Sequence, residues 1–109
     1  MTGWIFKVES NCADPAREQE FNDWYDNMHV PDLLKEEKAF MAASRYQEAH
    51  PQNGQGKFVA LFELETDDID KTMKLHEETE VSLKKRGRIS DLLKITARGA
   101  YRRIEEATK

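Results

Sequence analysis

The segment EFNDWYDNMHVPDLL, residues 20–34, decides how the chain folds, because it combines an aromatic helical face with a histidine and a proline. Its large apolar side chains recur every three or four residues, which is the spacing of one face of a helix. They are Phe21, Trp24, Tyr25 and Met28. His29 follows at the edge of this face, where it can contact both the core and a cavity. Pro31 has no amide hydrogen and disfavours helical geometry at Val30, so we expect the helix to break there and restart as a short turn over residues 32–35.

The composition predicts one small domain, residues 1–109, that associates with itself. A chain of this length buries about two thirds of the surface that its unfolded form exposes. Hydrophobic residues make up 39% of the sequence and charged residues 35%, and the strand patterns are partly apolar on both faces. One small layer of helices cannot cover that much apolar surface, so we expect a homodimer.

Charge and cysteine content exclude several classes of partner and location. The formal net charge of -4 provides no basic surface for a nucleic acid backbone. The single cysteine, Cys12, rules out an internal disulfide framework. No long apolar run predicts a signal peptide or a membrane span. We therefore expect a cytoplasmic protein that binds neither nucleic acid nor a membrane.

Four stretches have the alternation or the β-branched and aromatic content of strands. They are residues 4–9, 40–47, 58–64 and 95–104. The second and third are separated by Pro51–Gly56, where Pro, Asn-Gly and Gly indicate a hairpin loop. Residues 89–93 are ambiguous.

Helices are predicted between the first two strands and between the last two. Asp14 as N-cap and Pro15 at the first position begin the first helix, which extends to His29. Thr66 as N-cap begins the second, which ends at the basic residues 84–86. The inward stripe of this second helix is Ile69, Met73, His76 and Leu83. The order β-α-β-β-α-β is that of an α+β, ferredoxin-like domain, with an antiparallel four-stranded sheet and the helices on one face.

This order, together with WYDNMHVPDLL at residues 24–34, resembles the dimeric α+β barrel superfamily and, within it, the EthD-like and related small uncharacterised proteins. The resemblance implies that two sheets close face to face in a dimer, and that each subunit keeps a small-molecule pocket between its own sheet and helices. The superfamily includes cofactor-independent monooxygenases, polyketide cyclases, lactone isomerases, haem-degrading enzymes and proteins with no demonstrated catalysis. In several of these enzymes a histidine near the end of the first helix lines the pocket, and His29 is the matching position.

His29 is the candidate catalytic residue. A neutral imidazole can take a proton from a carbon next to a carbonyl, or from a phenol, and return it elsewhere, as in isomerisation, cyclisation, elimination or cofactor-free oxygenation. Asp26 and Asp32 lie close in sequence and can orient the ring or raise its pKa. The alternative is that His29 caps the helix by bonding a backbone carbonyl.

His76 lies on the apolar stripe of the second helix, and both helices cover the same face of the sheet. His29 and His76 can therefore face one cavity, although a buried histidine bonded to a neighbour is the commoner outcome. A metal site of two histidines with Asp26 or Glu77 lacks supporting ligand spacing, so we expect no metal and no cofactor.

Four strand residues leave their roles open between pocket, core and dimer interface. Tyr46 and Tyr101 can offer a hydroxyl to a ligand or fill the core. Arg45 and Arg98 can recognise a substrate carboxylate or form structural ion pairs, and we favour the structural role. In the structural role they would pair, across strands or between subunits, with Glu9, Glu48 or Glu63.

The leading function is that of a cofactor-independent enzyme, of lyase, isomerase, cyclase or oxygenase type, which uses acid/base chemistry on a small aromatic or polyketide-like carbonyl or phenolic compound. The candidate substrate-binding residues are Phe21, Trp24, Tyr25, Met28, Phe62 and His76. The alternative is a non-catalytic small-molecule-binding or accessory dimer, and a haem or metal enzyme is the third class. The expected partners are a small hydrophobic or aromatic ligand and a second copy of the chain.

Overall fold

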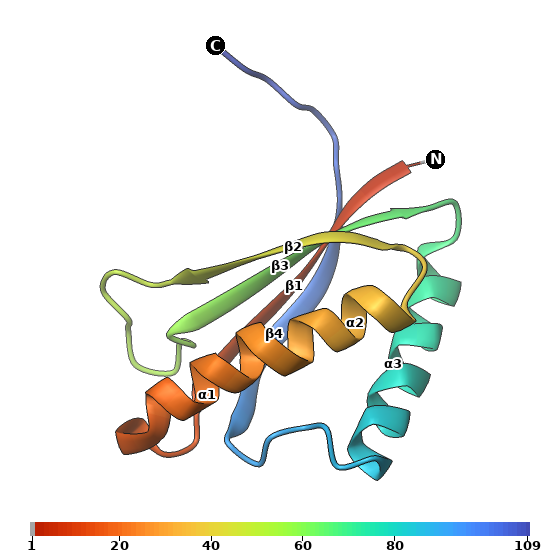
Figure 1. Ribbon diagram of the computed structural model, residues 1–109. Helices are drawn as coiled ribbons and strands as arrows, with labels where there is room; N and C mark the ends of the chain where they lie inside the picture. Colours follow the sequence, from red (N-terminus) through yellow and green to blue (C-terminus); the bar gives the residue numbers. More distant parts are fainter. Residues whose placement is uncertain (1) are drawn as a thin grey trace.

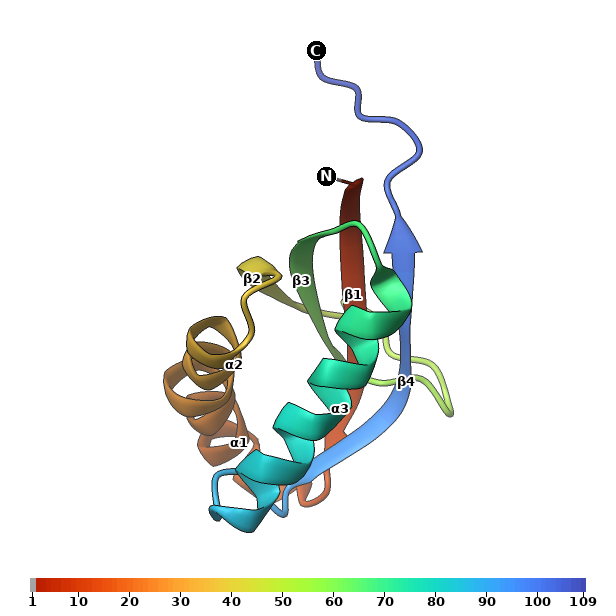
Figure 2. The same ribbon diagram turned by 90° about the vertical axis from the view of Figure 1, so that its right-hand side faces the viewer.

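Four antiparallel strands form one sheet in the order β2-β3-β1-β4, with the helices on one side of it (Figures 1 and 2). The computed structural model describes residues 2–109. The strands are β1 (Thr2–Cys12), β2 (Phe40–Gln47), β3 (Phe58–Thr66) and β4 (Leu93–Arg102). The helices are α1 (Glu18–Trp24), α2 (Val30–Glu36) and α3 (Ile69–Lys85). The predicted α+β, ferredoxin-like arrangement is confirmed.

The first helix differs from the prediction, because it does not break at Pro31. A π-helical turn, Tyr25–His29, joins α1 directly to α2, and Figure 1 shows one continuous rod. Val30 keeps helical backbone angles, and its amide bonds the Tyr25 carbonyl five residues earlier. The wider turn accommodates the proline ring, which in a regular α-helix would strike the carbonyl four residues before it. The expected short turn over residues 32–35 is therefore part of α2.

The ends of the helices follow the predicted chemistry with one exception. Asp14 caps a 3-10 turn, Pro15–Arg17, by accepting a hydrogen bond from the Ala16 amide. The N-cap of α3 is Asp68, not Thr66, because the Asp68 carboxylate accepts from the Lys71 amide. The Thr66 hydroxyl instead accepts from the amide of Asp68, and Thr66 itself ends β3.

The core lies between the helices and the inner face of the sheet. Side chains alternate along β1, so that Phe6 and Val8 are buried while Ile5 and Lys7 lie on the opposite face. The same alternation buries the following residues of β3: Phe58, Ala60, Phe62 and Leu64. No helix covers the opposite face of the sheet in the part of the chain that the structure describes (Figure 2). This uncovered face carries apolar side chains, among them Ile5, Val59 and Leu61.

Candidate functional site

A cluster of charged side chains surrounds the buried His76, where α3 passes over the sheet and the end of α2. His76, on the inward face of α3, is only 4% exposed. Its Nδ1 atom lies 2.7 Å from Oε2 of Glu37, and its Nε2 atom lies 2.8 Å from Oε1 of Glu80. Arg98 of β4 reaches the same Glu80 oxygen at 3.1 Å. An imidazole held between two carboxylates donates from both ring nitrogens when it is protonated.

The cluster keeps His76 charged at neutral pH. Burial lowers the pKa of His76, but hydrogen bonds and negative charge from Glu37 and Glu80 outweigh burial and raise the pKa to about 9. Burial raises the pKa of Glu80, while His76 and Arg98 lower it more strongly, so the net shift is downward. The ring of His76 also stacks on Phe40 at a centroid distance of 5.4 Å. His76 is therefore a positive charge held inside the molecule.

His29 lies in the π-helical turn and, unlike His76, has no carboxylate partner in the described chain. Its side chain is 5% exposed and stacks on Trp24 at a centroid distance of 4.7 Å. The indole of Trp24 is fixed by a 3.0 Å hydrogen bond from Nε1 to the Arg88 carbonyl. The Nδ1 atom of His29 is buried and has no hydrogen-bond partner among the described residues. The structure therefore does not support capping through this nitrogen, and a buried nitrogen without a partner requires an explanation.

Burial lowers the pKa of His29 to about 4, so the ring is neutral at pH 7. The positive charge of His76 adds to this shift, whereas the negative charges of Glu80 and Asp32 oppose it. The shared influence of Glu80 on the pKa values of both histidines places them near the same carboxylate. The π-helical turn places His29 there, and such turns occur frequently at functional sites.

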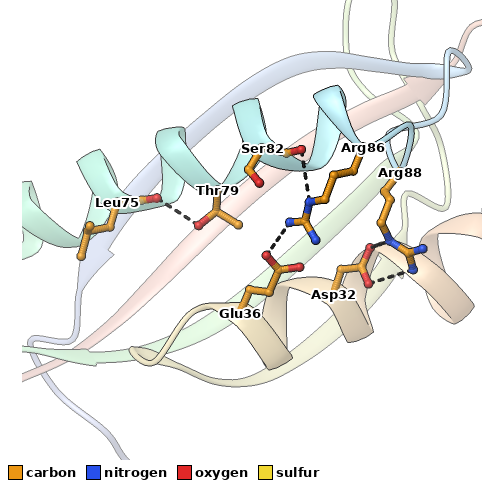
Figure 3. A network of polar contacts seen from close by, with 7 residues as sticks. All are labelled: Asp32, Glu36, Leu75, Thr79, Ser82, Arg86 and Arg88. Atoms are coloured by element: carbon orange, nitrogen blue, oxygen red, sulfur yellow. Dashed lines mark hydrogen bonds and ion pairs between the residues drawn. The ribbon is translucent and has the colours of Figure 1, made fainter.

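A cleft of about 550 Å³ opens beside this cluster, between the end of α2, the start of β2 and one side of α3. Glu37 joins the two features, since it lines the cleft and bonds His76. Figure 3 shows the α3 side of the cleft, with Glu36 of α2 opposite. Two ion pairs, Glu36 with Arg86 and Asp32 with Arg88, tie α2 to the end of α3 and the loop that follows it.

The predicted substrate-binding residues have two different surroundings. Phe21, Tyr25 and Phe62 are at most 1% exposed and belong to the core. Trp24 is partly buried beside His29, and Met28 is half-buried. None of these five residues, nor His29 or His76, is among the side chains that line the cleft.

The two strand arginines form ion pairs within the chain, but with other partners than predicted. Arg45 contacts Asp26 at 2.8 Å, and its guanidinium lies 4.2 Å from the centre of the Tyr25 ring. Arg98 contacts Glu80. The predicted cross-strand pairing with Glu9, Glu48 or Glu63 is wrong, because both arginines point toward the helical layer. Tyr46 and Tyr101 are more than half exposed.

Sequence reasoning did not single out Glu37 or Glu80. Glu80 follows His76 by four residues on the same helix, so its place on the same face was available from the spacing. Glu37 is distant in sequence and follows the end of α2, where no local pattern indicates its contact with α3. The suggested use of Asp26 and Asp32 to orient His29 is not seen, since Asp26 pairs with Arg45 and Asp32 accepts from Arg88. Among residues 2–109, no three histidine, cysteine or acidic side chains are grouped to hold a metal ion.

Comparison with solved structures gives the fold independently. No protein-family model and no curated protein matches the sequence. The chain is similar to an EthD family protein from Bacillus halodurans, with a TM-score of 0.51, 18% identity, and coverage of 91% of this chain and 97% of that one. It is also similar to a dimeric ferredoxin-like protein of unknown function from Thermobifida fusca, with a TM-score of 0.51, 14% identity, and coverage of 93% and 89%. At these identities the likeness concerns architecture, and the chain has the ferredoxin-like fold that these EthD and dimeric ferredoxin-like structures share.

Proposed function

We propose that the protein is a cofactor-independent enzyme that carries out acid/base chemistry on a small aromatic or polyketide-like carbonyl or phenolic compound. The feature that carries this proposal is a pair of buried histidines with opposite surroundings: Nδ1 of His29 has no partner among the described residues, whereas His76 lies between two carboxylates. These surroundings lower the pKa of His29 to about 4 and raise the pKa of His76 to about 9, so that near pH 7 His29 is neutral and His76 is protonated, with both of its ring nitrogens facing carboxylates. Environments that separate the pKa values of neighbouring groups are typical of acid/base sites.

In this proposal His29 takes the proton. A pKa of about 4 makes its imidazole a weak base, but the nearby Glu80 carboxylate stabilises the positive charge that develops on the ring as the proton arrives. The Nδ1 atom of His29 has no partner among the described residues, but it is buried and outside the cleft lining, so a ligand must enter past that lining to reach it. His76 holds the carboxylate of Glu37, and Glu37 lines the cleft, so His76 acts on a ligand in the cleft through Glu37.

The enzyme would act as a homodimer in the cytoplasm. One of the similar structures is described as dimeric, and the uncovered apolar face of the sheet supports the same assembly here. Cys12 is a free, buried thiol, as is usual in a reducing compartment. Within residues 2–109, no helix has the length and apolar character needed to cross a membrane.

Hydrogen–deuterium exchange tests proton abstraction without knowledge of the product. A panel of small aromatic and polyketide-like carbonyl compounds is incubated with the protein in D2O, and loss of the proton next to the carbonyl is followed by NMR. The wild-type protein should catalyse exchange in a member of the panel. His29→Gln should lower that rate by roughly a hundredfold or more, because glutamine cannot take the proton. The matched control is His50→Gln, since His50 is exposed in a loop.

Two outcomes separate the alternatives. Exchange at the wild-type rate in a folded His29→Gln variant would contradict the catalytic role of His29. Binding of panel compounds with no exchange in the wild-type protein would favour the non-catalytic binding or accessory dimer. An absorbance scan of the purified protein tests the third class, a haem or metal enzyme.

A further inference from the structure

The cleft between α2 and α3 has the dimensions and lining of a small-molecule site. Its volume of about 550 Å³ lies within the usual range for ligand pockets. Ala39, Phe40 and Leu75 give it an apolar surface, and Leu75 is 52% exposed. Figure 3 shows Leu75, Thr79 and Ser82 in a row along the side of α3 that faces α2. A planar apolar body can therefore lie against this row.

Glu37 is the most buried charged residue among those that line the cleft. It is 7% exposed, and its Oε2 atom lies 2.7 Å from Nδ1 of His76. A carboxylate has lone pairs for more than one donor, so a ligand in the cleft can donate a second hydrogen bond to Glu37. Hydrogen bonds to a charged acceptor are stronger than those between neutral groups, particularly when the acceptor is withdrawn from water.

The charges around the cleft favour an uncharged ligand. Three carboxylates line it, those of Glu36, Glu37 and Glu78. Three positive groups balance them: Arg86 pairs with Glu36, His76 pairs with Glu37, and Lys38 lines the cleft itself. An anionic ligand would either displace the Glu37 carboxylate from His76 or lie next to that carboxylate, and both arrangements cost free energy. A cationic ligand has no excess negative charge to bind, because three positive groups balance the three carboxylates.

We propose that this cleft binds a small uncharged molecule whose apolar body lies against Leu75 and Phe40, and whose phenolic or enolic hydroxyl donates to Glu37. The inference deepens the proposed function, on which it rests only for the choice of a hydroxyl as the donor. It names the ligand's recognition group and the place where the ligand enters. His76 then fixes the orientation of Glu37, and Glu37 is the residue that contacts the ligand.

Three matched probes test the recognition group: 1-naphthol, 1-methoxynaphthalene and 1-naphthoate. They share one ring system and carry a donor, no donor and a negative charge. Titrations are followed by backbone amide NMR shifts, which report both affinity and location. We expect 1-naphthol to bind about tenfold more tightly than 1-methoxynaphthalene, and 1-naphthoate to bind most weakly. The shifts should centre on the end of α2 and the cleft side of α3.

Two variants test the proposed contacts of the ligand with Glu37 and Leu75. Glu37→Gln keeps the size of the side chain but removes its charge, so the preference for 1-naphthol over 1-methoxynaphthalene should fall to roughly threefold or less. Leu75→Asn should weaken both probes by roughly fivefold, because the ring loses apolar contact. Val81→Asn is the matched control, since Val81 is 55% exposed on the same helix but does not line the cleft. It should leave both affinities unchanged.

The binding results for the cleft can be distinguished from the exchange results for His29, the proposed base. His29→Gln should retain binding of 1-naphthol, because His29 does not line the cleft. Absence of 1-naphthol binding, equal affinity for 1-naphthol and its methyl ether, tightest binding of 1-naphthoate, or shifts centred elsewhere would each overturn the cleft proposal. Because Leu75→Asn alters an exposed residue, it tests the proposal even where Glu37→Gln fails to fold. Loss of proton exchange with retained 1-naphthol binding would instead concern His29 alone.

Discussion

His76 is a charged residue in the interior, and its contribution to stability must depend on pH. The pKa of His76 is raised to about 9 in the folded protein, against an ordinary value of 6.5. A pKa raised by folding stabilises the folded state fully below the unfolded value, and the stabilisation is lost as pH rises through the folded value. The window for His76 therefore runs from about pH 6.5 to pH 9.

We predict that the free energy of unfolding falls by about 3 kcal/mol across this window through His76. The measurement is denaturant unfolding between pH 6 and pH 10 for the wild-type protein and His76→Gln. The variant should be less stable at pH 6 and should show a flatter profile, since glutamine does not titrate. His50→Gln should reproduce the wild-type profile. Parallel profiles for wild type and His76→Gln would show that His76 is not charged in the folded protein.

The sequence predicted that His29 and His76 face inward, but it did not predict their partners. His29 and His76 followed from helical periodicity, because one face of a helix is fixed by spacing within the helix. The contact of His76 with Glu37 depends on how α3 packs against the end of α2, and no local pattern encodes that packing. The charge state of each histidine depends on the same packing. The sequence therefore indicated the two histidines but not their opposite states.

At the scale of the elements, strand positions were predicted well and the shape of the first helix was not. β2 was predicted at its observed bounds, because alternation and a hairpin loop determine a strand locally. Pro31 is a helix breaker by its own chemistry, and the prediction followed that rule. The π-helical turn before it resolves the conflict, and the sequence carries no separate signal for such a turn. The continuous rod is what places His29 beneath Trp24 and not at an open end.

The end of α3 gives an element-scale prediction. Gly87 has φ of +71°, and the Arg88 amide that follows bonds the Leu83 carbonyl, which together form a Schellman motif. No atom lies within 4 Å of a Cβ built at Gly87, so substitution there changes only backbone strain. Gly87→Ala should lower the free energy of unfolding by about 1 kcal/mol.

The comparison variant for this prediction is Gly87→Asn. Asparagine tolerates positive φ better than alanine, so this variant should lose less free energy of unfolding. Thermal unfolding should rank the three proteins by stability, with wild type the most stable, Gly87→Asn next and Gly87→Ala the least stable. An alanine variant as stable as wild type would mean that the helix end adopts another conformation. The position also matters for the site, because Arg88 holds both Trp24 and Asp32.

At the scale of the whole molecule, the uncovered face of the sheet is the main surface that no helix of the described chain covers. Cross-strand neighbours on this face include the pairs Ile5 with Tyr101 and Val59 with Tyr46. Leu61 of β3 lies between them, on a central strand. The sequence predicted this surface because apolar residues occupy both faces of its strands, but alternation alone does not identify what covers the second face.

We predict a homodimer in which two such faces pack together and bury at least about 1,500 Å² in total. This requires each subunit to bury about a tenth of its 7490 Å² accessible surface, which one face of the sheet can supply. Leu61→Glu should shift the protein to a folded monomer, because a carboxylate placed in an apolar interface must be desolvated without a partner. Leu75→Glu is the matched control: Leu75 lies on the helical side, so the dimer should persist. Sedimentation at micromolar concentration measures both variants against wild type. A monomeric wild-type protein would contradict the predicted dimer. A dimer unaffected by Leu61→Glu but lost in Leu75→Glu would place the contact on the helical side, and the uncovered sheet face would then need another partner.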